Sequence, residues 1–143
     1  MDIQSVFLSE AATNGLSFDT LIFIIMVVCI FLSAFFSMSE TAFSSANVVK
    51  LKSLVEDRKS GAKKALQLSE DFDKTVTTLL IGNNIVNTAL STVSVGFFIK
   101  LGIAEEWVSL ASTLIITVTL LIFGEILPKT IAKNNPEAVA TKV

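Results

Sequence analysis

Histidine is absent from this chain of 143 residues, and cysteine occurs once, at Cys29. Without histidine the chain cannot build an ordinary zinc or copper site, and one cysteine indicates no disulfide framework. A serine protease would lack its general base, and the apolar runs hold no pair of Asp residues for an aspartyl protease. We therefore expect no enzyme, and we interpret Cys29 as a small hydrophobic residue within an apolar run.

Basic residues are missing from the start of the chain, where the first one is Lys50. A cleavable signal peptide begins with a positive region, so we expect the first apolar run to remain in the mature protein. Lysine and arginine gather instead in residues 50–74 and beyond residue 128. By the positive-inside rule the N-terminus lies outside, and the 50–74 loop and the C-terminus are cytoplasmic. The loop is either this orientation signal with a solvated surface, which we favour, or a patch that binds anionic membrane lipid.

Charged residues are also absent from three long stretches, residues 20–39, 75–99 and 107–124. The hydrophobic share of 52% and the mean hydropathy of +0.70 exceed what is usual for a soluble domain. A run of about 18 such residues is long enough to cross a hydrocarbon core of about 30 Å. The predicted fold is an all-α, multi-pass protein of the cell membrane, with three transmembrane helices at about 20–45, 75–99 and 107–127.

The spans leave little room for other domains. We divide the chain into an extracytoplasmic lead segment, residues 1–18, and a transmembrane domain, residues 19–143. No charge or helix breaker precedes Lys50, so we expect the first helix to reach that residue. Apolar positions recur at helical spacing on both sides of Ser60-Gly61, which predicts two short amphipathic helices in the cytoplasmic loop. An Asn-Pro-Glu sequence predicts the start of a juxtamembrane helix over 135–143, which we expect to be cut short.

Polar residues interrupt all three apolar runs. They are Ser33, Ser37 and Glu40 in the first run, Gly82, Asn83, Asn84 and Asn87 in the second, and Gly124, Glu125 and Pro128 in the third. On a helix, Ser33, Ser37 and Glu40 share one stripe, and Asn83 lies one turn from Asn87. Acidic and amide groups at membrane depth are costly, so they usually face a cavity, a partner or an ion.

The third run combines a carboxylate with a helix breaker. Glu125 lies on a helical stripe that is otherwise apolar, and Pro128 follows three residues later. Pro128 has no N–H to give to the carbonyl of Gly124 and clashes with it, which predicts a kink or an end of the helix. The result is a free carbonyl oxygen beside a carboxylate. Counted along antiparallel helices, Glu125, Ser37 and Asn83 lie at similar depth, which predicts one polar cavity in the inner half of the bilayer.

Two interpretations of this polar set remain open. All its ligand atoms are oxygens, which is the preference of hard cations such as Mg²⁺, Ca²⁺ and Na⁺. Alternatively, Ser, Gly and Asn are common in contacts between membrane helices, and packing explains those residue types well. Packing explains poorly why Glu125 stands beside an unpaired carbonyl. We therefore favour ion binding.

Three stretches carry a family resemblance: FFSMSETA at 35–42, LIGNNIVN at 80–87 and FGEILPKT at 123–130. At these residues the chain resembles the membrane domain of the cyclin-M (CNNM) and CorC family of magnesium transport proteins, from about Phe18 onward. The resemblance implies a homodimer whose subunits each have three transmembrane helices and a juxtamembrane helix. It also implies an inward-open acidic cavity that holds a dehydrated Mg²⁺.

The resemblance further implies a set of ligands. Carried over to this chain, they are Ser33, Ser37, Gly82, Asn83, Asn87 and Glu125. To these we add Gly124 for its freed carbonyl, and Glu40, Asn84 and Pro128 in supporting roles. Glu40 either attracts cations or pairs with a lysine of the loop. Family members usually carry a cytosolic pair of CBS modules that bind ATP, which we expect in the full-length protein but not in these residues.

The expected function is transport of Mg²⁺ across the membrane, as efflux, with Na⁺ as the coupling ion. The alternative is a membrane-anchored regulatory or scaffold module that senses Mg²⁺ through the same site without moving it. Both functions need the same ligands. We expect no nucleic-acid partner.

Overall fold

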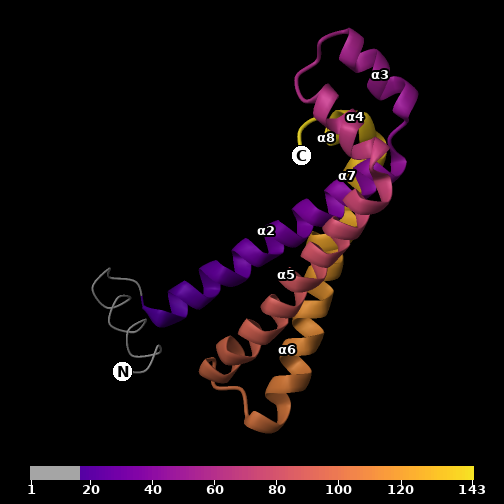
Figure 1. Ribbon diagram of the computed structural model, residues 1–143. Helices are drawn as coiled ribbons and strands as arrows, with labels where there is room; N and C mark the ends of the chain where they lie inside the picture. The colour runs from indigo at the N-terminus through magenta and orange to yellow at the C-terminus, as the bar shows by residue number, and fades with distance from the viewer. Residues whose placement is uncertain (1–16) are drawn as a thin grey trace.

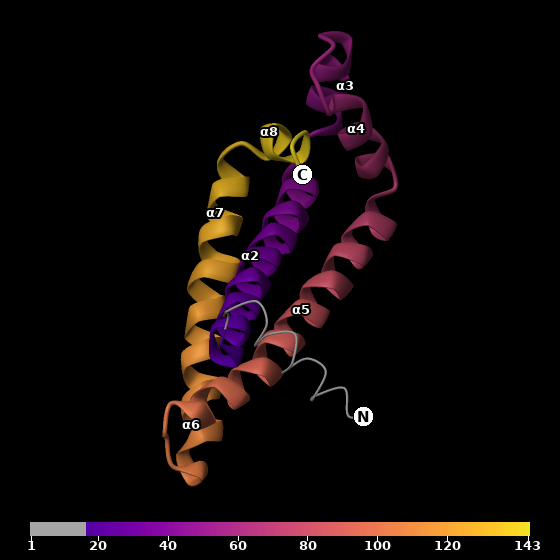
Figure 2. The same cartoon turned by 90° about the vertical axis from the view of Figure 1, so that its left-hand side faces the viewer.

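The computed structural model describes residues 17–143, and all the regular structure in that range is helical. Three long segments run along the molecule, with short helices gathered at one end (Figures 1 and 2). The long segments are α2 (Phe18–Ser45), α5 (Phe72–Lys100) and a third composed of α6 (Glu105–Thr119), the π-helix η1 (Leu120–Ile126) and α7 (Leu127–Asn134). The short helices are α3 (Val48–Glu56), α4 (Ala62–Glu70) and α8 (Pro136–Ala140). The predicted lead segment, 1–18, lies almost wholly outside the described residues.

Two of the long segments have the length and apolarity of membrane spans, Phe18–Ser45 and Glu106–Asn134. The helix α5 is as long, with 29 residues, but is not one of these two candidates. Asn83, Asn84 and Asn87 lower its apolarity. The prediction of an all-α fold is therefore confirmed, and two of the three predicted spans are candidate membrane helices by length and apolarity.

Two apolar clusters join the long helices, and polar residues lie between them. One cluster consists of Ala42, Phe43, Leu51, Ala65, Ala132 and Ala140. The other consists of Met26, Leu90, Phe98, Val108 and Ile116. Along α2, Ser33 and Ser37 lie between Met26 of one cluster and Ala42 of the other. Burying one large apolar side chain contributes about 1.5–3 kcal/mol, so most of the apolar stabilisation lies at the two ends.

The first helix ends at Ser45 and does not run on to Lys50. Ala46 has extended backbone, and Asn47 then caps α3. The side-chain oxygen of Asn47 accepts the N–H groups of Val49 at 2.8 Å and Lys50 at 3.4 Å. An Asn at this position satisfies N–H groups that a helix start leaves unpaired. The cap thus ends α2 in a stretch without charge, Gly or Pro.

The short helices follow the local sequence signals. Gly61 has a φ of +79° directly before α4, at the Ser60-Gly61 break. That left-handed conformation favours glycine. Pro136 occupies the first turn of α8, and the carbonyl of Asn135 accepts the Val139 N–H at 3.1 Å. The side chain of Asn135 makes no capping hydrogen bond.

Glu137 ties α8 to the start of α3. Its Oε1 accepts the backbone N–H of Asn47 at 3.1 Å and lies 3.6 Å from Lys50 Nζ, and the side chain is 14% exposed. Burial raises the pKa of this carboxyl. Hydrogen bonds from its own N–H and that of Asn47, together with the Lys50 charge, outweigh burial, so the pKa of Glu137 lies below its ordinary value.

A pH dependence of stability follows from Glu137. Because the folded-state pKa is lowered from 4.5, the contact stabilises the protein above that pH and is lost as the pH falls through the lowered value. We expect thermal unfolding in detergent to show a loss of about 1 kcal/mol on acidification, which Glu137→Gln abolishes. Glu70→Gln, at an exposed position, is the matched control and should keep the wild-type profile. A wild-type pH profile in Glu137→Gln would contradict this assignment.

Candidate functional site

Ser33, Ser37 and Asn83 form a buried, hydrogen-bonded cluster between α2 and α5, which we call the Ser–Asn cluster. Ser33 Oγ donates to Asn83 Oδ1 at 3.0 Å, and Asn83 Nδ2 donates to Ser37 Oγ at 3.5 Å. Both serines are fully buried, and Asn83 is 8% exposed. The serines lie one turn apart on α2, so a single amide reaches both. Each polar side chain here compensates the burial of another.

Gly124 brings the third segment against this cluster. The residue is buried, and a Cβ built on it would lie 3.0 Å from Ser33 Oγ. The absence of a side chain therefore allows the main chain of η1 to approach the serine hydroxyl. Four of the predicted site residues thus come from three helices and meet at one place.

The main chain next to Gly124 forms a π-helix, Leu120–Ile126. The N–H of Leu127 donates to the carbonyl of Ile122, five residues earlier. The helix does not end at Pro128. The third span was predicted to end near residue 127, but the helix continues as α7 to Asn134. The wider turn accommodates the proline ring, which in a regular α-helix clashes with the carbonyl four residues earlier. π-Turns inside α-helices occur frequently at functional sites.

Pro128 leaves a carbonyl of the π-helix without its usual partner. Because proline has no backbone N–H, Pro128 donates a hydrogen bond neither to the carbonyl of Gly124, four residues earlier, nor to that of Phe123, five residues earlier. In a π-helix the five-residue partner is the relevant one, so the carbonyl that Pro128 leaves without an N–H is that of Phe123, one residue before the predicted Gly124.

Buried residues of the third segment recur at every fourth position. In a regular α-helix each step of four residues turns the buried line by about 40°, so four steps would carry Ala132 about 160° away from Ile116. The π-helix places more residues in each turn and so offsets this drift. The buried residues are Val108, Ser112, Ile116, Gly124, Pro128 and Ala132, with Leu120 half-buried.

Glu125 follows Gly124 in sequence but makes no hydrogen bond with the Ser–Asn cluster. The side chain is half-buried and has no ion pair within residues 17–143. The helical spacing that predicted its stripe assumed a regular α-helix, and the π-helix changes that spacing. The carboxylate therefore remains available to a ligand near Gly124.

Asn87 lies one turn from Asn83 on α5. Its Oδ1 is buried and has no hydrogen-bond partner within the described part of the chain. Leaving a buried acceptor unpaired costs about 1–3 kcal/mol. Such an atom requires an explanation, and a ligand that supplies positive charge is one.

Three other predicted residues make no hydrogen bond with the cluster. Gly82 packs against Phe36, because a Cβ built on it would lie 2.6 Å from the ring. The side chain of Asn84 is exposed. Glu40 Oε2 lies 3.6 Å from Nζ of Lys129, a lysine of α7 and not of the predicted loop. The sequence prediction missed this pair because it depends on the helix continuing past the proline.

Within residues 17–143, no three acidic or cysteine side chains come together in a group that could hold a metal. A cation at the Ser–Asn cluster would therefore be bound mainly by neutral oxygens. Hydroxyl, amide and carbonyl oxygens suit hard cations when at least one carboxylate supplies charge.

Comparison with known proteins gives a consistent result. A family model described as "Cyclin M transmembrane N-terminal domain" matches residues 24–143. A UPF0053 protein of Haemophilus influenzae is 40% identical over 119 residues, 83% of this chain and 28% of that protein. The UPF0053 inner membrane protein YfjD of Escherichia coli is 35% identical over 109 residues, 76% of this chain and 25% of that protein. The chain thus spans about a quarter of the length of these curated relatives.

Proposed function

This chain belongs to the cyclin M transmembrane-domain family, and from that membership we propose that it moves Mg²⁺ across the cell membrane through the Ser–Asn cluster. The observation that carries the proposal is the meeting of α2, α5 and η1 at buried oxygen atoms. Apolar clusters lie on both sides of this point and hold the helices without it. Buried polar groups that the fold does not need are the usual mark of an intramembrane binding site.

The ligands have distinct roles in this proposal. The hydroxyls of Ser33 and Ser37 and the amide oxygen of Asn83 replace water around the ion. Glu125 supplies the negative charge, and the unpaired Oδ1 of Asn87 supplies a further oxygen. Mg²⁺ loses its water reluctantly and demands near-octahedral geometry, so a mixed shell of protein oxygens and retained water suits it.

Ion binding must rearrange the cluster. Asn83 Oδ1 now accepts the Ser33 hydroxyl, and its lone pairs are needed for a cation. The hydroxyl of Ser33 has to turn so that its oxygen also faces the ion. The cation thus substitutes for a hydrogen bond between α2 and α5, which couples binding to the contact between these helices.

In the proposed topology α5 is a third span, with the N-terminus outside and the C-terminus in the cytoplasm. Asp19 and Phe18 contact Lys100 at one end of the bundle, which we place at the outer surface. Trp107 is 61% exposed at the start of the third segment, as expected of an interfacial anchor. The basic α3–α4 region lies at the opposite end (Figure 2), which we place on the cytoplasmic side.

The remaining parts of the proposal concern the longer protein. We infer efflux with Na⁺ as the coupling ion, a homodimer, and a cytosolic CBS pair in the portion that this chain does not cover. Large apolar side chains exposed on α5 and α6, such as Ile85 and Leu114 at 64% each, suit contact with lipid or a second copy. The name of the Escherichia coli relative supports a location in the cell membrane.

A flux assay on the full-length protein tests the function. The protein is reconstituted in liposomes that contain a Mg²⁺-sensitive dye, and Mg²⁺ movement is followed with and without a Na⁺ gradient. We expect flux that depends on the cluster and is lost in Asn83→Ala. Binding without flux in the wild type would reject transport and assign the sensing function instead.

A further inference from the structure

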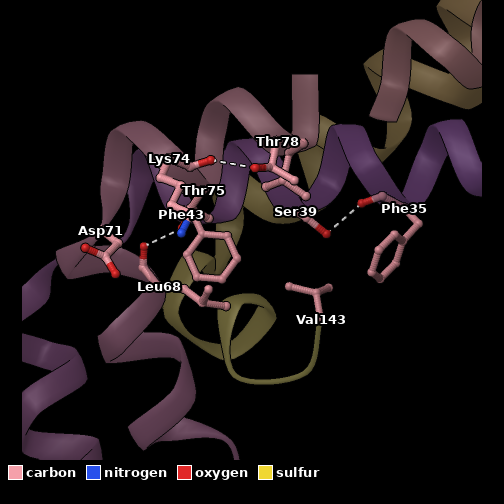
Figure 3. Close-up of a pocket in the computed structure, with 10 residues that line it drawn as sticks. Phe35, Ser39, Phe43, Leu68, Asp71, Lys74, Thr75, Thr78 and Val143 are labelled. Atoms are coloured by element: carbon pink, nitrogen blue, oxygen red, sulfur yellow. Dashed lines mark hydrogen bonds between the residues drawn. The ribbon is translucent and has the colours of Figure 1, made fainter. Parts of the chain in front are cut away.

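A cavity of about 310 Å³ lies at the end of the bundle where α2, α4 and α5 meet the C-terminal residues (Figure 3). It shares no residue with the Ser–Asn cluster. Its lining residues are Phe35, Ser39, Phe43, Leu68, Asp71, Lys74, Thr75, Thr78, Leu79 and Val143. Phe43 is only 5% exposed, whereas Phe35 is 42% exposed, so the cavity reaches from the surface to the buried core.

The hydroxyl groups in the wall do not present free donors to the cavity. Each donates its hydrogen to a main-chain carbonyl. The bonds are Ser39 Oγ to Phe35 O at 2.7 Å, Thr75 Oγ1 to Leu68 O at 2.9 Å and Thr78 Oγ1 to Lys74 O at 2.8 Å. With these donors satisfied and Phe43, Leu79 and Val143 alongside, the interior suits hydrocarbon.

One carboxylate and one ammonium stand at the mouth. Asp71 and Lys74 are both exposed at the start of α5, and neither has an ion pair within residues 17–143. The predicted second span begins at residue 75, so these charges lie at the level of lipid headgroups. Glu70 and Asp73 lie beside them and make the mouth acidic overall, which disfavours an anionic headgroup.

We propose that this cavity binds one acyl chain of a zwitterionic phospholipid with a primary amine. The phosphate of the headgroup pairs with Lys74, and its ammonium pairs with Asp71. The acyl chain extends along α2 and α5 toward Phe43. This site is independent of Mg²⁺ binding.

Photo-crosslinking tests the proposal. The full chain is reconstituted in phosphatidylglycerol vesicles that contain a trace of phosphatidylethanolamine with a diazirine on its acyl chain. The label on Phe43 is then measured by peptide mass spectrometry. Because Phe43 is buried, a freely exchanging lipid at the surface labels it poorly. We expect the phosphatidylethanolamine probe to label Phe43 about fivefold more than a phosphatidylglycerol probe with the same diazirine. This ratio corresponds to the largest free energy usual for one exposed ion pair.

Three variants make the result specific. Thr78→Phe fills the cavity and should reduce the Phe43 label at least about fivefold, whereas Thr77→Phe, exposed on the same helix but outside the lining, should not. In Asp71→Asn, the two lipid probes should label Phe43 about equally. Equal labelling in Thr78→Phe and Thr77→Phe, or no label on Phe43, overturns the proposal. If Thr78→Phe does not fold by circular dichroism, Asp71→Asn decides: an unchanged ratio overturns the headgroup assignment.

Discussion

Replacing Asn83 by alanine is expected to weaken Mg²⁺ binding by more than about 100-fold while the helices remain folded. The change removes a predicted ligand oxygen and both hydrogen bonds of the Ser–Asn cluster. It removes no member of either apolar cluster, so circular dichroism should change little, whereas thermal unfolding should show a loss of about 1–3 kcal/mol because Ser33 and Ser37 lose their buried partner. Isothermal titration calorimetry of the protein in detergent measures the affinity.

Asn84→Ala is the matched control, because it removes the same side chain at the next position. Asn84 is exposed and its side chain makes no hydrogen bond with the cluster, so its variant should bind Mg²⁺ within about threefold of the wild type. Glu125→Gln keeps the size of the side chain, removes its charge and should weaken binding as strongly as Asn83→Ala. Wild-type affinity in Asn83→Ala, or equal losses in the two asparagine variants, would remove the site assignment.

Gly61→Ala is expected to destabilise the protein by about 3 kcal/mol or more. Two effects combine. Gly61 has a φ of +79°, and a left-handed conformation costs an L-residue roughly 1–2 kcal/mol. A Cβ at this position would also lie against the carbonyl oxygen of Thr141, a main-chain atom that can move only if the chain after α8 shifts. The thermal unfolding midpoint in detergent measures the loss.

Gly102→Ala separates the two effects. Gly102 has nearly the same φ, +80°, but a Cβ there meets nothing within 4 Å. Its variant should therefore show the backbone cost alone, and the difference between the variants reports the contact with Thr141. Digestion with a protease should release the C-terminal residues faster in Gly61→Ala than in Gly102→Ala. Equal midpoints for the two variants would show that Thr141 does not pack on Gly61.

The helices were largely predictable because the signals for them are local. Absence of charge marked the long segments, and Ser60-Gly61 marked the break between α3 and α4. The end of α2 was not predicted, because the cap by Asn47 competes with a sequence that could also continue as a helix. The π-helix has no compositional signal. Its only trace is the four-residue spacing of residues that proved to be buried.

The meeting of Ser33, Ser37 and Asn83 was expected from helical spacing and from the family resemblance. The way they meet was not. Spacing places side chains on a face, but it does not show whether they face a cavity or one another. The hydrogen bond from Ser33 to Asn83 depends on how closely α2 approaches α5, which large side chains elsewhere on both helices determine.

The π-helix makes the length of the third segment a structural parameter. A π-helical turn holds about one residue more than an α-helical turn, so one residue fewer between Leu120 and Ile126 would restore a regular α-helix with nearly the same face toward α2 on either side. At its present length, a regular α-helix would instead carry Ala132 about 160° away from Ile116. When family members are aligned across this stretch, a one-residue gap therefore signals the loss of the π-helix and not a change in which helix face meets α2.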